Sequence, residues 1–158
     1  YPHAVVISSF SKNLSLAGER IGYVLAAPDM PNKDALMNGL ALTNRILGYV
    51  NAPAIGQTLA VKCLNARVDV SVYERRRKLM ADILDAAGYE YAMPKGAFYF
   101  FPKAPGGDDV AFAAKLQEQR VLAVPGSGFG YPGYFRLCFA VEDAVIERSA
   151  EGFKKANS

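Results

Sequence analysis

The chain has 158 residues, of which 51% are hydrophobic and 21% charged, and its formal net charge is +3. A chain of this length is about one domain, and its composition is that of a folded globular protein with enough apolar side chains for a core. The weak, scattered charge gives no support to a nucleic-acid-binding protein, and no apolar run reaches the ~18 residues of a membrane span.

The N-terminal part of the chain predicts two strands followed by two helices. The apolar, β-branched run at 4–10 is typical of a short buried strand, and 20–26 predicts a second strand. Apolar residues near helical spacing indicate a helix over 33–48. Another helix is expected over 53–66, because Pro53 is tolerated in a first turn.

A third helix carries a basic run. It is expected to begin at Ser71, where Glu74 three residues later completes a capping box, and to end at Gly88. The run RRRK at 75–78 is short, and we interpret it as a solvated helix face and not as a phosphate or nucleic-acid patch.

Beyond Gly88 the sequence predicts a compact α+β unit. The stretch YEYAMPKGAFYFFPK contains two strand-like runs around a Pro-Lys-Gly turn, which favours an antiparallel hairpin. Asp108 or Asp109 is expected to cap a helix that reaches about Gln119. The remaining predicted elements, in order, are a strand VLAVPG, a glycine-rich loop at 126–133, a strand YFRLCFA and a helix over about 142–155.

The first part has too few strands to close a sheet of its own. We therefore expect an α/β protein in which residues 1–68 are the C-terminal remnant of a larger domain and residues 69–158 form a small C-terminal α+β domain. The start, YPHAVVISSF, lacks an initiator Met and the features of a signal peptide, so we expect the chain to begin in mid-protein.

Cysteine and histidine usage limits the available chemistry. Cys63 and Cys138 lie in apolar surroundings and are expected to be buried free thiols, which fits a reducing cytoplasm. His3 is the single histidine, so a His-based triad or a multi-His metal site has little to build on, and no metal is expected.

The stretch SSFSKNLSLAGERIG combines a lysine and an arginine in an unusual setting. Lys12 lies among three serines, and Arg20 follows eight residues later, flanked by Gly18 and Gly22. A lysine in a tight loop beside a strand end can act as a Schiff-base nucleophile. The glycines would let the backbone come close to a ligand.

A phosphorylated aldehyde such as pyridoxal phosphate would suit this loop. Lys12 would bind its aldehyde, and the hydroxyls of Ser9 and Ser11 with the planar guanidinium of Arg20 would bind its phosphate. The same residue types also make an ordinary polar loop with a surface lysine and an ion-paired arginine. Residue types alone favour that second interpretation.

The segment SSFSKNLSLAGERIGYV closely resembles the cofactor-lysine segment of the fold-type I pyridoxal-phosphate aminotransferases, the aspartate aminotransferase superfamily. That pattern is S-x-S-K followed by G-x-R-x-G. Three later blocks are similar to the same family in the same order. PKGAFYFFP resembles the hairpin near the substrate, VPGSGFG resembles the loop before the last strands, and YFRLCFA resembles the strand with the substrate-carboxylate arginine, here Arg136.

The resemblance implies roles for individual residues. Lys12 would hold the cofactor and move a proton at the substrate Cα, acting as base and then acid. Ser9, Ser11 and Arg20 would anchor the phosphate, and Arg136 would bind the α-carboxylate.

Three aromatic residues have less defined roles. Phe98 either walls the substrate pocket or belongs to the core, at about even odds, since buried Phe is common. Tyr23 and Tyr99 are expected to be core residues.

The family's pattern also includes parts that this chain does not contain. The aspartate that partners the pyridine nitrogen and the tyrosine at the ring hydroxyl come well before the lysine, and only eleven residues precede Lys12 here. We therefore expect the C-terminal part of an aminotransferase, with residues 1–68 the remnant of its large pyridoxal-phosphate domain. By itself this part is expected to be inactive.

The implied activity moves an amino group between an α-amino acid and a 2-oxo acid in amino-acid metabolism. The whole enzyme is expected to be a cytoplasmic homodimer without nucleic-acid or membrane partners. Two alternatives stay open, because fold and cofactor do not fix chemistry. One is another reaction on the same fold, by a lyase, racemase or decarboxylase. The other is a non-catalytic ligand-sensing module of a transcription regulator.

Overall fold

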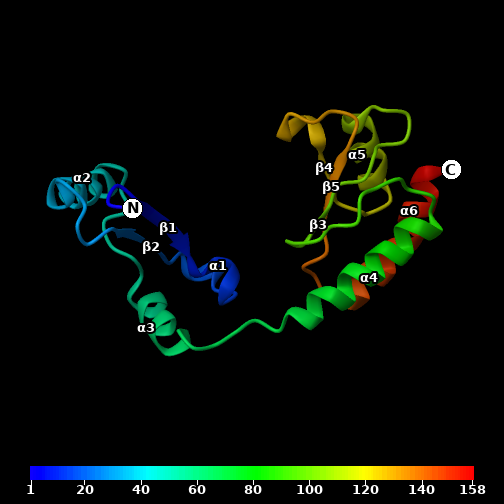
Figure 1. Cartoon of the computed structure of the whole chain (residues 1–158). Helices are drawn as coiled ribbons and strands as arrows, with labels where there is room; N and C mark the ends of the chain where they lie inside the picture. The colour runs from blue at the N-terminus through cyan, green and yellow to red at the C-terminus, as the bar shows by residue number, and fades with distance from the viewer. The chain divides into compact units, whose positions relative to one another are not determined.

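The computed structural model describes residues 1–158, which divide into two units, Tyr1–Val68 and Asp69–Ser158. Helices and strands occur in both units (Figure 1). The mixed α/β class expected from the sequence is confirmed. None of the helices has the length and apolar content that crossing a membrane requires.

The first unit is built around one antiparallel strand pair. Strands β1 (Val5–Ser9) and β2 (Gly22–Ala26) pair in register from Val5 opposite Ala26 to Ser9 opposite Gly22. The other elements of the unit are α1 (Phe10–Asn13), η1 (Ala17–Glu19), α2 (Lys33–Ile46) and α3 (Ala54–Cys63). The two predicted strands and two predicted helices are therefore present, each shorter than expected by a few residues.

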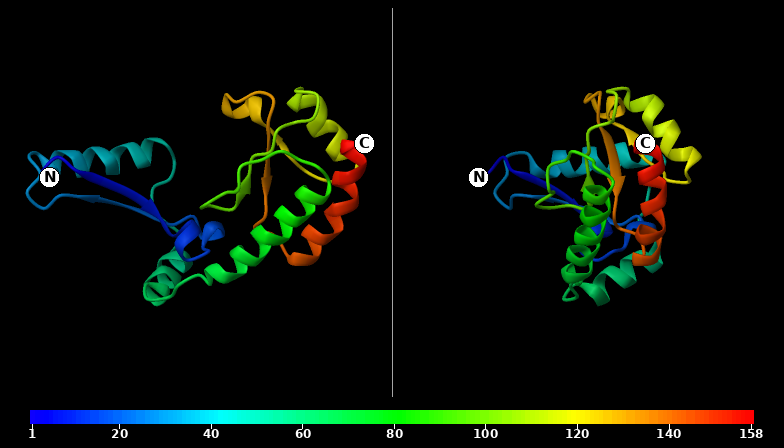
Figure 2. Two further views of the ribbon diagram at one scale, coloured as in Figure 1. Left: turned by 45° about the vertical axis from the view of Figure 1, so that its right-hand side comes forward. Right: turned by 90° about the vertical axis from the view of Figure 1, so that its right-hand side faces the viewer.

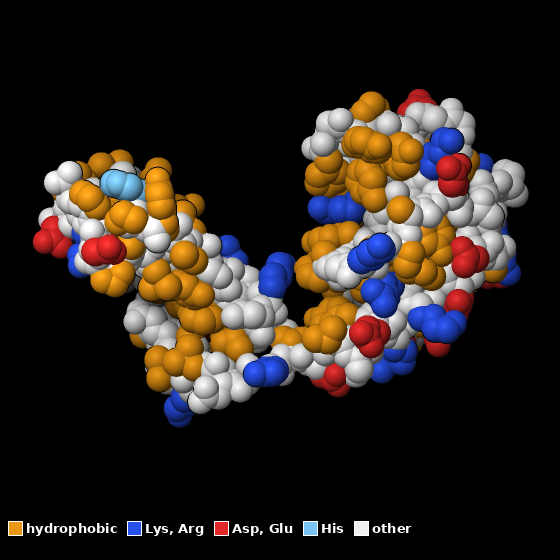
Figure 3. All heavy atoms as spheres, viewed as in Figure 1, with side chains coloured by type: hydrophobic (Ala, Val, Ile, Leu, Met, Phe, Trp, Pro, Cys, Tyr) orange, Lys and Arg blue, Asp and Glu red, His pale blue; other side chains and the backbone are white.

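The strand pair is not buried, which corrects the expectation for residues 4–10. Every residue of β1 is exposed, and Ile7 keeps 77% of its surface accessible. A two-stranded ribbon is buried only where other elements cover its faces. In the first unit the buried residues are Ile21, Gly56 and Ala60. Hydrophobic side chains are visible over much of this unit (Figure 3).

The second unit is a three-stranded antiparallel sheet with helices. The strand order is β3-β5-β4, so β5 is central. Helices α4 and α6 lie side by side (Figure 2). The elements are α4 (Val70–Ala86), β3 (Tyr99–Phe100), α5 (Asp109–Glu118), β4 (Val124–Pro125), η2 (Gly126–Phe129), β5 (Phe135–Cys138) and α6 (Asp143–Asn157).

This unit has a continuous aromatic core. The largest fully buried side chains include Phe100, Phe135, Phe139 and Phe153. Tyr89 packs edge-on against Phe112, Phe135 and Phe153 and donates from its hydroxyl to the Phe153 carbonyl at 3.0 Å. Burial raises the pKa of Tyr89 to about 12, so this hydroxyl stays protonated and keeps its hydrogen bond at neutral pH.

Two local predictions in this unit need correction. The N-cap of α4 is Asp69 and not Ser71, because the Asp69 carboxylate accepts the Ser71 N–H at 3.0 Å. The hairpin expected within 89–103 forms only one strand. β3 pairs with β5, and a single backbone bond from Lys103 N–H to Glu90 O links the two arms.

The basic run on α4 is satisfied within the protein. Arg75 and Arg76 both form ion pairs with Asp143, at 2.7 and 3.0 Å. Arg77 donates to the Pro94 carbonyl, and Lys78 pairs with Asp82. Arg75 and Lys78 are exposed, but Arg76 and Arg77 are half-buried, so the interpretation of the run as a solvated helix face is only partly correct.

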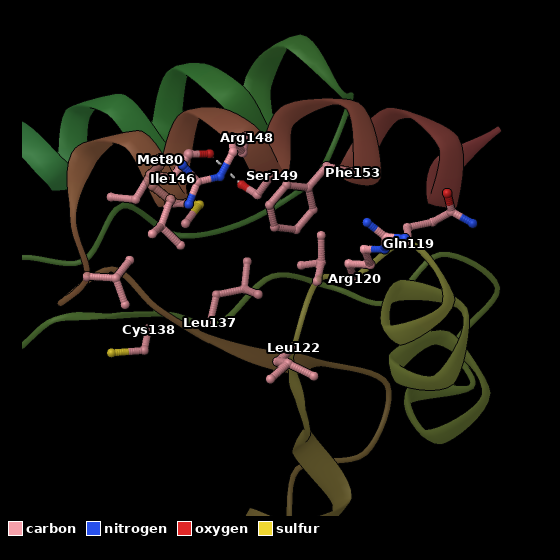
Figure 4. Close-up of a pocket in the computed structure, with 13 residues that line it drawn as sticks. Met80, Gln119, Arg120, Leu122, Leu137, Cys138, Ile146, Arg148, Ser149 and Phe153 are labelled. Atoms are coloured by element: carbon pink, nitrogen blue, oxygen red, sulfur yellow. Dashed lines mark hydrogen bonds between the residues drawn. The ribbon is translucent and has the colours of Figure 1, made fainter.

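The cysteines are free but not both buried. Cys63 is half-buried, and Cys138 is exposed at the end of β5. Cys138 also borders a cavity of about 650 Å³, lined by residues from α4, β5, α6 and the segment before β4 (Figure 4). None of the residues expected to act on a substrate lines this cavity.

Candidate active site

The lysine segment is a short closed loop between the paired ends of β1 and β2. Ser9 is the last residue of β1 and lies opposite Gly22. The Phe10 N–H donates to the Ile21 carbonyl at 3.1 Å, which ties the two ends of the loop together. Lys12, which follows β1, and Arg20, which precedes β2, therefore lie at the same end of the strand pair.

Arg20 has an unusual backbone conformation. Its φ of 53° and ψ of 44° are left-handed, a region that residues other than glycine rarely adopt. Its guanidinium donates from Nη1 to the Ala17 carbonyl at 2.8 Å. Strained residues of this kind persist where the surroundings hold them, and they cluster at functional sites.

Two glycines allow the backbone packing that holds this loop. A Cβ on Gly22 would lie 2.8 Å from the Ser8 carbonyl oxygen, so only glycine fits opposite the end of β1. A Cβ on Gly56 of α3 would lie 2.7 Å from the Ile21 side chain and 3.0 Å from the Glu19 carbonyl. Helix α3 therefore packs directly against the residues on both sides of Arg20.

The donors of this loop suit a phosphate dianion. The hydroxyls of Ser9 and Ser11 take part in none of the hydrogen bonds of the structure, and Arg20 forms no ion pair. The ion-paired arginine of the polar-loop interpretation is thus not found. Two hydroxyls and a guanidinium at one end of a strand pair are the donors that a phosphate requires.

Arg136 lies in the second unit, at the middle of β5. Strand alternation explains its position, because Phe135 and Leu137 on either side are buried in the core while Arg136 is half-buried. Val124 of β4 is its cross-strand partner. Tyr99 of β3 lies opposite Cys138 and is therefore a diagonal neighbour on the same face.

Two aromatic rings hold the Arg136 guanidinium. Its central carbon lies 4.6 Å from the centre of the Tyr99 ring and 4.5 Å from the centre of the Phe129 ring. No ion pair or hydrogen bond of the structure uses this guanidinium. Cation–π contacts orient the guanidinium without using its N–H donors. These donors therefore remain available to an anion such as a carboxylate.

The aromatic expectations are partly corrected. Tyr99 and Tyr23 are not core residues, because Tyr99 is half-buried against Arg136 and Tyr23 is 37% exposed beside Phe10. Phe98 is half-buried. It packs against the core and against the Tyr99 ring, with the two ring centres 4.6 Å apart.

The expected site residues fall into two groups. Ser9, Ser11, Lys12 and Arg20 share one loop of the first unit. Phe98 and Arg136 lie in the second unit, on neighbouring strands.

Sequence reasoning missed Gly56, Phe129 and Asp109. Gly56 and Ala60 are four apart on α3 and form a small-residue face, a spacing that can be found in the sequence. Phe129 lies within the glycine-rich loop, but its contact with Arg136 depends on how the loop folds. The sequence indicates Asp109 only as a helix cap, whereas its carboxylate accepts N–H groups from that same loop.

Known proteins resemble almost the whole chain. The family model described as aminotransferase class I and II matches residues 1–153. An aspartate aminotransferase of Thermotoga maritima is 31% identical over 98% of this chain and 39% of its own length. A (5-formylfuran-3-yl)methyl phosphate transaminase of Methanocaldococcus jannaschii is 31% identical over 96% of this chain and 41% of its own.

A solved structure gives the same result. A crystal structure of an amino transferase from Eubacterium rectale superposes with a TM-score of 0.84 and 41% identity, over 99% of this chain and 39% of that one. The chain thus spans about two fifths of the length of these relatives. A match of this extent shows that the chain belongs to the class I and II aminotransferase family.

Proposed function

We propose that this chain supplies the lysine-bearing and carboxylate-binding parts of a pyridoxal-phosphate-dependent aminotransferase. The observation that carries the proposal is the closed loop between β1 and β2. It brings Lys12, two serine hydroxyls and Arg20 to one end of a strand pair. Membership of the family supports the same assignment.

Each residue of the lysine loop has a role that follows from its chemistry. Ser9, Ser11 and Arg20 would hold the phosphate of the cofactor, and the Lys12 amine would hold its aldehyde. Pyridoxal phosphate, when bound, supplies an electron sink for the negative charge that develops at the substrate Cα. The Lys12 amine would take a proton from the substrate Cα and later return one.

Arg136 orients the substrate. Its guanidinium, in contact with the Tyr99 and Phe129 rings, would bind the α-carboxylate through two parallel N–H bonds. This group is common to all α-amino acids, so Arg136 does not select a side chain.

The rest of the proposal concerns the whole enzyme. Residues 1–68 belong to its large cofactor-binding domain, residues 69–158 form its small domain, and the enzyme is a cytoplasmic homodimer. The free thiols of Cys63 and Cys138 are compatible with a reducing compartment. Sedimentation of the whole enzyme tests the homodimer.

Covalent labelling tests the central assignment. Borohydride reduction of the whole holoenzyme, followed by peptide mapping, should place the label on Lys12, and a label on another lysine refutes the role. Lys33 is a useful internal control, since it donates to the Pro28 carbonyl in the same unit.

The 158-residue chain alone should show no saturable, one-to-one cofactor complex and no turnover of any amino acid. The aromatic and acidic groups expected around the cofactor ring are not among its residues. A tight complex that turns over would show that these groups are dispensable.

A further inference from the structure

The loop that supplies Phe129 is held by a single buried carboxylate. Asp109 is the first residue of α5. It is 5% exposed and is the one buried charged residue of the chain. Its Oδ2 accepts the Ser127 N–H at 2.7 Å, and its Oδ1 accepts the Gly133 N–H at 3.2 Å. One carboxylate therefore ties two points of the loop that are six residues apart.

Between these two points the loop has two backbone bonds of its own, from Gly130 N–H to Ser127 O and from Tyr131 N–H to Gly126 O, and Phe129 and Tyr131 pack against Phe101. Its glycines add no packing. A Cβ added to Gly128 or Gly130 would meet no other atom within 4 Å, and Gly130 has a positive φ of 71°. Glycines lose more conformational freedom on folding than other residues. Phe129 lies between them, so the position of its ring depends on its edge contact with Phe101 and on how the loop is held at its ends.

The ends are closed first by the backbone and then by Asp109. The Gly126 N–H donates to the Tyr134 carbonyl at 2.7 Å, which closes the base of the loop. Ser127 is the next residue and is two residues from Phe129. The bond from Ser127 to Asp109 therefore fixes the start of the η2 turn that carries the aromatic ring.

We infer that Asp109 is a positioning residue for Arg136, acting through the loop 126–133 and the Phe129 ring. The inference rests on the proposed function, in which Arg136 binds the substrate carboxylate. With the loop fixed, the guanidinium contacts both the Phe129 ring and the Tyr99 ring. Without it, the guanidinium retains only the Tyr99 contact and samples orientations that do not fit a carboxylate.

The charge state of Asp109 fits this role. Its hydrogen bonds from the Ser127 and Gly133 backbones lower the pKa of the Asp109 carboxyl. The carboxylate is ionised at neutral pH, and both oxygens can accept.

A spectroscopic experiment on the 158-residue chain tests the inference without requiring activity. The Arg136 Nε–H signal, assigned by its loss in Arg136→Lys, should be shielded by the two rings relative to that of the exposed Arg45. In Asp109→Ala the signal should move most of the way to the Arg45 position, and in Asp109→Asn part of the way. Asp143→Asn, which removes a different paired carboxylate of the same unit, should leave the signal unchanged.

The outcome of this experiment decides the inference. The amide signals of Leu84 and Phe153 report whether the core is intact. A folded Asp109 variant with an unchanged Arg136 signal overturns the inference. If both variants lose the core signals, Asp109 is a folding residue and the inference is also overturned.

Kinetics of the whole enzyme separate positioning from general damage. If the binding-competent arrangement falls to roughly a tenth of the population, the apparent affinity falls about 10-fold. Asp109→Asn should therefore raise the KM for the amino acid about 10-fold, with kcat within about 3-fold and cofactor retention unchanged. A fall in kcat with an unchanged KM contradicts the inference. If the parent enzyme shows no transamination, the proposed function fails, while the spectroscopic result still judges the link from Asp109 to Arg136.

Discussion

The two units of the chain differ most in how much of each is buried. In Tyr1–Val68 the buried residues are Ile21, Gly56 and Ala60, and Gly56 packs against Ile21 beside Arg20. In Asp69–Ser158 a core runs through both long helices and the sheet, with Leu84 and several phenylalanines wholly inaccessible. The unit with the most recognisable sequence motif therefore has the smaller core.

The difference shows that the interactions that shape a sequence motif can be separate from the hydrophobic core that stabilises a fold. The first unit keeps its loop closed with a few backbone bonds and two glycines, while exposing apolar side chains such as Ile7 and Ile46. Burial of apolar surface is the dominant stabilising contribution to folding. We therefore expect the second unit to be stable by itself and the first to depend on burial that these 68 residues do not provide.

The largest expected effect comes from separating the units. Residues 69–158 alone should unfold cooperatively and give well-dispersed amide signals, whereas residues 1–68 alone should show neither. Thermal unfolding followed by near-ultraviolet circular dichroism, together with amide spectra, distinguishes the two. Exposed strand edges also favour pairing between copies, so residues 1–68 are expected to associate. A cooperative, monomeric fold for residues 1–68 would break the comparison.

A matched pair of leucines measures the same contrast within the 158-residue chain. Leu84 of α4 is 0% exposed and Leu25 of β2 is 57% exposed. Leu84→Ala should lower the free energy of unfolding by about 2–5 kcal/mol, because it removes buried atoms and leaves a cavity. Leu25→Ala should change it by less than about 0.5 kcal/mol. Urea unfolding measures both, and similar losses from the two variants would show that the strand pair is packed after all.

Local signals in the sequence were sufficient for most of the fold. Apolar runs located β1 and β2, and helical spacing with capping residues located the helices. Gly88 ended α4 with the positive φ of 78° that a glycine at this position allows. The burial of β1 was not predictable, because an apolar run indicates that a strand can be buried and not that another element covers it. The prediction of a hairpin within 89–103 was wrong for a related reason. β3 pairs with β5, which lies more than thirty residues away in the sequence.

The candidate site shows the same limit. Lys12 and Arg20 are eight residues apart, and their spacing together with the resemblance identified them. Arg136 was identified by resemblance alone, because nothing in YFRLCFA indicates that Tyr99 and Phe129 hold its guanidinium. Asp109 was missed because its hydrogen bonds span eighteen and twenty-four residues.

Substitution of one arginine in each unit compares the functions of the two units. In the whole enzyme, Arg20→Ala in the first unit should weaken cofactor retention about 10- to 150-fold, the equivalent of about 1.5–3 kcal/mol for hydrogen bonds to a charged group. Its effect on amino-acid preference should be small.

The second arginine should give the reverse pattern. Arg136→Lys keeps the charge but loses the planar pair of donors, so it should slow the half-reaction for every α-amino acid by a similar factor and leave cofactor retention unchanged. Equilibrium dialysis of the cofactor and single-turnover kinetics measure the two effects. An Arg136→Lys enzyme impaired with only one class of side chain would make Arg136 a specificity residue.

The smallest expected effect is an acid-dependent loss of stability in the second unit. Asp143 begins α6 and accepts from Arg75 and Arg76 of α4, which hold the pKa of Asp143 at about 2, below its usual 3.8. A carboxyl whose pKa is lowered by folding stabilises the folded state above its unfolded pKa, and this contribution is lost as the pH falls toward the folded pKa. The loss of unfolding free energy in Asp143→Asn relative to the parent chain should therefore be constant above about pH 4, shrink as the pH falls from 3.8 to about 2, and vanish below that.

Asp82→Asn, which removes the exposed i,i+4 partner of Lys78 within α4, is the control and should have the smaller loss at neutral pH. Urea unfolding at pH 7, 4, 3 and 2 measures the two curves, and a deficit for Asp143→Asn that persists at low pH would show that the side chain acts through packing and not through its charge.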